Sequence, residues 1–277
     1  MLLLLKIFFG LFLLYCSAVI GVYAFQRRLM YHPHQHVNTP HRDKSPDLEK
    51  VTLTTSDGLT LESYYKAPRV SESGKVYPTV LYFHGNTGPA GDAAHKLIPV
   101  ADAGYGVLLT EYRGYGPNAG NPSEQGLITD AQAALEFVRS KQGEDAPVVY
   151  YGMSMGTGVA NGLAERHSPA GLILECGFTS MTDAAKIHYP WFPVRYLIKD
   201  TFDSKRRIAS LTAPVLFLHG QMDGTVPVEQ GKAMYETAPV QDKTLKLYPE
   251  GRHTNLYDFG ASDDVVQWLN DRFPIEK

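Results

Sequence analysis

The sequence predicts an α/β fold in which helices cover both faces of a mostly parallel sheet. Length and composition suit one sizeable core, because the chain has 277 residues, of which 44% are hydrophobic and 20% charged. Short apolar runs alternate with helical patterns, and buried parallel strands produce this alternation. The runs begin near Thr79, Gly106, Pro147, Gly171, Pro214 and Thr244.

Residues 1–25 are predicted to form an N-terminal membrane anchor. The 19 residues from Ile7 to Phe25 carry no charge, and as a helix they would span about 28 Å, enough to cross a bilayer. Arg27 and Arg28 outweigh Lys6, which favours a cytoplasmic domain but leaves the sidedness open. A cleaved signal peptide, or a lipoprotein signal ending at Cys16, is the alternative.

Residues 26–50 are expected to form a polar linker that contains proline. His32, His34 and His36 alternate in this stretch, with His41 nearby. A metal site is one interpretation. A solvated loop beside the membrane is favoured, because no carboxylate or cysteine stands at a fixed spacing from them, so no metal is predicted.

The domain predicted over 51–277 opens with a β-hairpin. Residues 51–55 and 59–65 alternate apolar and polar side chains, and Ser56-Asp57-Gly58 supplies the turn. Between Glu124 and Gln142 the apolar residues share one helical face. In such a fold the active site lies at the carboxyl ends of the strands.

A nucleophile elbow is predicted at Gly152-Met153-Ser154-Met155-Gly156. This stretch follows an apolar run and precedes small residues suited to a helix. Such a turn is too tight for side chains beside the nucleophile, and it lifts the serine hydroxyl above the sheet. We therefore expect Ser154 to be the nucleophile.

Two later residues are predicted to activate this serine. His253 lies in a polar loop after an apolar run, where it serves as the general base, and Asp223 follows another run and orients the imidazole. The order serine, aspartate, histidine is that of α/β-hydrolases. The backbone amides of Asn86, after an early strand, and Met155 are expected to form the oxyanion hole.

A short lid is predicted over 178–211, where the helical pattern loosens. Aromatic side chains concentrate there, and we expect three of them to line an acyl pocket: Tyr189, Trp191 and Phe192. The alternative, which the sequence supports equally well, is an ordinary crossover helix with a packed aromatic face.

Charge and cysteine content exclude several functions. The net charge is −3, without a basic stripe, so nucleic acid is not an expected partner. Cys16 and Cys176 are the two cysteines, which predicts neither a disulfide nor a redox motif. The proposed serine chemistry needs no cofactor and no metal.

The chain resembles membrane-anchored α/β-hydrolases that include fungal polarity-linked hydrolases and, more distantly, animal protein depalmitoylases. The resemblance rests on residues 26–33, His84-Gly85-Asn86, Glu111–Gly116, Pro122-Ser123-Glu124 and 152–156. It implies the same nucleophile, acid and base. It departs at the N-terminus, where the depalmitoylases carry a cysteine cluster and this chain has one cysteine.

The predicted function is that of a serine hydrolase acting on acyl esters or thioesters through an acyl-enzyme. The expected partners are a small or lipid-like acyl substrate and the membrane. One alternative is a peptidase or aminopeptidase on the same fold, and another is a membrane-tethered interaction module without catalysis. A serine-directed phosphonate separates the module from the enzymes, and a comparison of esters with amides separates the two enzymes.

Overall fold

The computed structural model describes residues 1–35 and 47–275. Over these residues an eight-stranded sheet runs in the order β1-β2-β4-β3-β5-β6-β7-β8. The first two pairings are antiparallel and the others parallel, which confirms the α/β-hydrolase fold and its N-terminal hairpin. The strands are β1 (Glu49–Thr54), β2 (Thr60–Lys66), β3 (Thr79–Phe83), β4 (Gly106–Thr110), β5 (Val148–Met153), β6 (Gly171–Glu175), β7 (Val215–Gly220) and β8 (Lys243–Tyr248).

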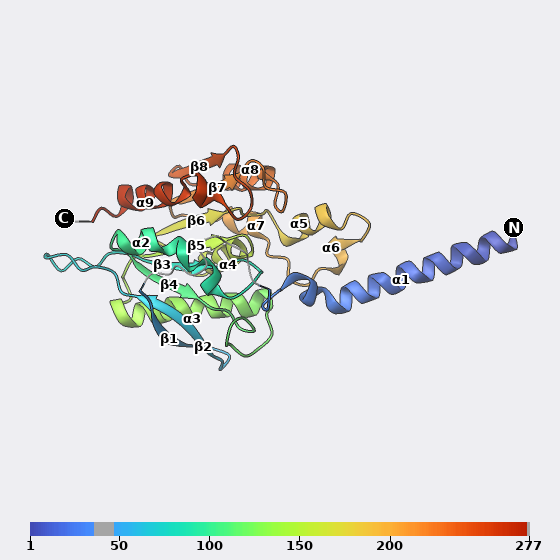
Figure 1. The fold of residues 1–277 in the computed structure, drawn as a ribbon, viewed down its shortest axis with the longest axis horizontal. Coiled ribbons are helices and arrows are strands. Elements are labelled where there is room, and N and C mark those ends of the chain that lie inside the picture. Colours follow the sequence, from blue (N-terminus) through green and yellow to red (C-terminus); the bar gives the residue numbers. More distant parts are fainter. Residues whose placement is uncertain (36–46, 276–277) are drawn as a thin grey trace.

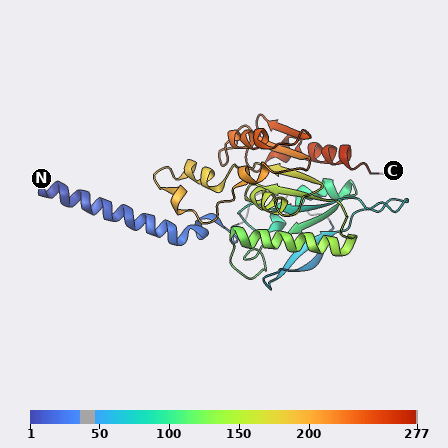
Figure 2. The same ribbon diagram turned by 180° about the vertical axis from the view of Figure 1, so that it is seen from behind.

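Helices cover both faces of this sheet (Figures 1 and 2). One face carries α3 (Glu124–Gln142), α4 (Met155–Ala164), α7 (Ser204–Ile208) and α8 (Val228–Thr237), and the other carries η1 (Ala90–Leu97), α2 (Ile98–Asp102), η2 (Leu256–Phe259) and α9 (Ala261–Arg272). Because both faces are covered, every residue of β3, β4, β6 and β7 is buried. Two apolar cores result, one on each side of the sheet.

The segment predicted as a lid divides into two parts. The helices α5 (Met181–His188) and α6 (Val194–Leu197) project beyond the sheet on the side of the N-terminal helix (Figure 1). In contrast, α7 packs against α4 and α8 within the helical layer. Only the first part of residues 178–211 therefore lies where a lid would.

The N-terminal helix α1 (Leu2–Met30) extends from the domain as a rod (Figure 1). It is long and apolar enough to cross a bilayer, which fits the predicted anchor. The helix continues five residues past Phe25, into the stretch expected to be a linker, because Gln26 is buried against the domain. The linker's other end also differs, since β1 already begins at Glu49.

Candidate active site

Ser154 occupies a strained turn between β5 and α4. Its φ of 53° and ψ of −120° lie in a region that residues with a side chain rarely adopt. A Cβ added at Gly152 would lie 2.3 Å from the carbonyl oxygen of Gly156, and one added at Gly156 would lie 1.9 Å from that of Phe83. Both flanking glycines are therefore required for α4 to pack this closely on the sheet.

The side chains of Ser154, His253 and Asp223 form a continuous hydrogen-bonded chain. His253 Nε2 lies 2.9 Å from Ser154 Oγ, and His253 Nδ1 lies 2.8 Å from Asp223 Oδ2. The three residues follow β5, β8 and β7 respectively, so the carboxyl ends of the parallel strands bring them together. This arrangement suits a general base between a nucleophile and an orienting acid.

Asp223 is held as a carboxylate. Its Oδ1 accepts the amide hydrogens of Thr225 at 2.8 Å and Val226 at 2.9 Å. Burial alone would raise the pKa of Asp223, but contacts with His219 and His253 and the amide of Val226 lower that pKa well below its usual range. His219 was not predicted from the sequence; its Nε2 lies 3.5 Å from Asp223 Oδ2.

Cys176 adjoins this acid–base pair, immediately after β6. Its φ is 49°, and its sulfur lies within 4.8 Å of ligand atoms of both Asp223 and His253. Burial raises the pKa of the Cys176 thiol well above its ordinary value. Burial therefore favours the protonated thiol over the thiolate.

The two residues predicted to supply oxyanion donors both adjoin Ser154 in one cavity, Asn86 after β3 and Met155 at the start of α4. The amide of Met155 begins the helix, so it has no partner within that helix. The Asn86 carbonyl accepts from the amide of His32 and from the Tyr115 hydroxyl, each at 2.9 Å. Its side-chain Nδ2 donates to the carbonyl of Met30, 2.8 Å away at the end of α1.

An apolar cavity of about 230 Å³ leads away from Ser154. Tyr189 and Phe192 line it, as predicted for an acyl pocket, whereas Trp191 does not, because it points outward with 83% of its surface exposed. Sequence analysis did not predict that α1 forms one wall of this cavity. That wall consists of Val22, Gln26, Leu29 and Met30.

A second, more polar cavity of about 90 Å³ also adjoins Ser154. Its lining includes His253, Asn86 and Lys96. Lys96 forms a buried ion pair with Glu175, which also accepts a hydrogen bond of 2.6 Å from the Tyr151 hydroxyl. This pair neutralises the lysine charge beside the nucleophile.

The histidines that follow the N-terminal helix form no metal cluster among the described residues. His32 joins the fold through its backbone, in a parallel bridge to Thr87. His34 is exposed, while His36 and His41 lie outside the described residues.

Comparison with known proteins places this chain among hydrolases. Residues 74–197 and 193–259 match the Hydrolase_4 family, described as serine aminopeptidase, S33. Protein bem46 of Schizosaccharomyces pombe is 33% identical over 88% of each chain. The lysophosphatidylserine lipase ABHD12 of Xenopus tropicalis is 35% identical over 80% of this chain and 62% of that longer protein. An esterase structure from Pyrococcus furiosus superposes with a TM-score of 0.67 at 20% identity, covering 88% of this chain and 98% of the esterase, and so shares the fold.

Proposed function

Because the chain belongs to the α/β-hydrolase family described as serine aminopeptidase, S33, we propose that it is a membrane-anchored serine hydrolase of acyl esters or thioesters. One observation carries the proposal. The hydrogen-bonded chain Ser154–His253–Asp223 opens directly into an apolar cavity. A nucleophile beside an apolar cavity suits a substrate with an acyl chain.

In this proposal, Ser154 Oγ attacks the acyl carbonyl carbon while His253 Nε2 takes the hydroxyl proton. The bond to the leaving oxygen or sulfur breaks, and His253 returns the proton to the leaving alcohol or thiol. Water then attacks the acyl-enzyme and gives a proton to His253, which passes it back to Ser154 as the acid leaves. Asp223 stays ionised and stabilises the imidazolium, in keeping with its lowered pKa.

The amides of Asn86 and Met155 would stabilise the negative oxygen of each tetrahedral intermediate. A donor of this kind contributes roughly 100- to 1000-fold to the rate. Both residues line the same cavity as Ser154, which supports the assignment.

The acyl preference rests on the cavity and on relatives. None of the residues lining the apolar cavity is acidic, and Asp92, which lines the second cavity, is buried, whereas an aminopeptidase needs an accessible carboxylate to bind the substrate's ammonium group. Relatives include a protein named as a lysophosphatidylserine lipase. The family description favours the aminopeptidase as the second candidate, so the substrate test includes both.

The full-length protein in detergent micelles is assayed with p-nitrophenyl esters of increasing acyl length and with amino-acyl p-nitroanilides. We expect ester hydrolysis, and at least about a 10,000-fold loss in Ser154→Ala because the nucleophile is gone. Ser168→Ala, an exposed serine, is the matched control. Full activity in Ser154→Ala would overturn the mechanism, and faster cleavage of the anilides would favour the aminopeptidase.

A further inference from the structure

We propose that the acyl substrate reaches Ser154 laterally from the lipid leaflet, through an entrance between α1 and the aromatic segment Ile187–Val194, and that this segment inserts into the same leaflet. The substrate would then be an acyl amphiphile resident in the bilayer. The inference deepens the proposed function and rests on it, since it requires both the acyl hydrolase and the membrane anchor.

The first argument is that the membrane helix itself walls the apolar cavity. Val22 and Met30 both line it, together with Ser154, and they stand eight positions apart in the helix, or about 12 Å. Val22 lies inside the charge-free run that ends at Phe25. This wall therefore leads from the expected hydrocarbon layer to the nucleophile, and it is apolar except at Gln26, whose side chain is hydrogen-bonded to the domain.

The second argument is that α1 is fixed against the domain. The Gln26 side chain donates to the carbonyl of Leu197 at 2.9 Å and accepts the amide of Lys199 at 2.7 Å. Arg27 donates two hydrogen bonds to the buried Asp200 carboxylate, of 2.8 and 3.1 Å. These contacts tie the helix to the end of α6 and to the residues that follow it, so the cavity wall has a defined position.

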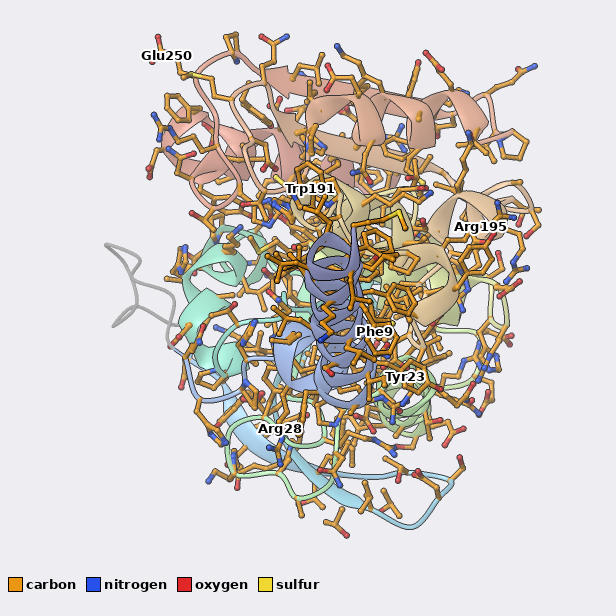
Figure 3. All side chains as sticks on the ribbon, turned by 90° about the vertical axis from the view of Figure 1, so that its right-hand side faces the viewer. Phe9, Tyr23, Arg28, Trp191, Arg195 and Glu250 are labelled. Atoms are coloured by element: carbon orange, nitrogen blue, oxygen red, sulfur yellow. The ribbon has the colours of Figure 1, made fainter. Side chains whose placement is uncertain are left out.

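The third argument is the chemistry of the aromatic segment. Residues 187–194 contain no lysine, arginine, aspartate or glutamate. Trp191 is 83% exposed, and Ile187 and Tyr189 are each 48% exposed. Figure 3 looks along α1 and shows Trp191 on the face from which the helix emerges. A lipid leaflet removes the cost of exposing these side chains to water.

The segment also contacts α1 within the part expected to cross the membrane. The Tyr15 hydroxyl donates to the carbonyl of Trp191 at 3.0 Å, and the Tyr15 ring stacks on Phe192 with centroids 6.3 Å apart. Tyr15 precedes Phe25 by ten residues, or about 15 Å of helix. Trp191 therefore lies beside the hydrocarbon-spanning part of α1.

Most of the backbone amides that the segment carries are paired within the protein, as an environment without water favours. In hydrocarbon, each polar backbone group needs a partner within the protein. The amides of Tyr189, Phe192 and Val194 donate to nearby carbonyls, and Pro190 and Pro193 have no amide hydrogen. Tyr15 satisfies the carbonyl of Trp191. The basic side chains of Lys186 and Arg195 flank the segment, as suits contact with lipid headgroups.

The entrance is tested by filling it from α1. Val22→Trp places a large side chain on the cavity wall, whereas Ile20→Trp places the same group on an exposed side of the helix. With full-length protein in phosphatidylcholine vesicles, we expect Val22→Trp to lower hydrolysis of monooleoylglycerol about tenfold or more. In the control variant Ile20→Trp, hydrolysis of both monooleoylglycerol and p-nitrophenyl acetate should stay near wild type. Equal monooleoylglycerol rates in the two variants would overturn the entrance.

Insertion is tested without any activity measurement, by using the chain's two tryptophans. Trp268→Phe leaves Trp191, and Trp191→Phe leaves the buried Trp268 as the control. In phosphatidylcholine vesicles brominated on the acyl chains, we expect strong quenching of Trp191 fluorescence and little of Trp268. Trp191 quenched instead by aqueous acrylamide would overturn insertion. Because this readout needs no substrate, it separates failure of this inference from failure of the proposed hydrolase activity.

Discussion

Asn86 links the surroundings of Ser154 to the N-terminal helix α1. Its backbone amide is the proposed oxyanion donor, while its side chain donates to the carbonyl of Met30 and its carbonyl accepts from His32. These bonds connect the Asn86 side chain to the end of α1 and the Asn86 carbonyl to the residues just after α1. A hydrogen-bond donor stabilises an oxyanion fully only when it is held in position, because small displacements of the donor weaken transition-state stabilisation.

We therefore expect Asn86→Ala to lower kcat for p-nitrophenyl esters by roughly 10- to 100-fold with KM nearly unchanged, since the amide remains but loses its tether. Thr87→Ala is the control, because Thr87 contacts the Asn86 side chain at 3.2 Å without holding it to α1. Steady-state kinetics on both variants measure the difference. An unchanged kcat in Asn86→Ala would show that the tether does not position the donor.

Asp223 makes stability depend on pH. Its folded-state pKa is lowered, so its ionised form stabilises the fold above the ordinary carboxyl pKa of about 4. That contribution disappears as the pH falls through the lower, folded-state pKa. We expect acidification from about pH 6 to about pH 3 to lower the wild-type melting temperature by about 3 °C more than that of Asp223→Asn, as 1 kcal/mol is worth about 2–4 °C. Parallel acid-induced losses in thermal melts of the two proteins would contradict this.

At the scale of elements, the contact of α4 with β3 depends on Gly156. A Cβ there would lie 1.9 Å from a backbone carbonyl oxygen of β3, which cannot move without disturbing the central sheet. We expect Gly156→Ala to destabilise the protein by about 3 kcal/mol or more. Gly91→Ala is the control, because nothing lies within 4 Å of its added Cβ. Thermal melting compares them, and similar melting temperatures would refute the packing argument.

The strands and the long helix α3 were predictable because their signals are local. Thr79, Gly106 and Gly171 begin strands where the sequence indicates, and α3 has the bounds expected from its apolar face. The contacts of α1 were not predictable, since Gln26 finds its partners at Leu197 and Lys199, about 170 residues later. The outward direction of Trp191 was missed for a related reason, because an aromatic residue carries no sign of which way it points.

The site was predictable to the extent that its parts follow strands. The loops at the carboxyl ends of parallel strands lie at the same edge of the sheet. This made it possible to place Ser154, Asp223 and His253 close together from the sequence. The role of His219 could not be predicted in this way. His219 lies within β7, and it contacts Asp223 only because the turn after that strand brings the two side chains together. The wall formed by α1 depends on how the helix meets the domain, which local sequence patterns do not encode.

At the scale of the whole molecule, α1 has two separable parts. Its first turns are exposed and apolar, as suits a bilayer. Its last turns, from Val22 to Met30, wall the cavity and hold Asn86. The helix thus has the length and composition of an anchor along most of its length, and at its end it forms part of the candidate active site.

Two truncations distinguish these parts. Removing residues 1–21 should leave hydrolysis of p-nitrophenyl butyrate near wild type in detergent, because the cavity wall and the Asn86 tether remain. Removing residues 1–30 should lower kcat by at least about tenfold, because the oxyanion donor loses its partners and the cavity opens to water. Circular dichroism checks that both proteins fold. Equal activity of two folded truncations would mean that α1 serves as an anchor alone.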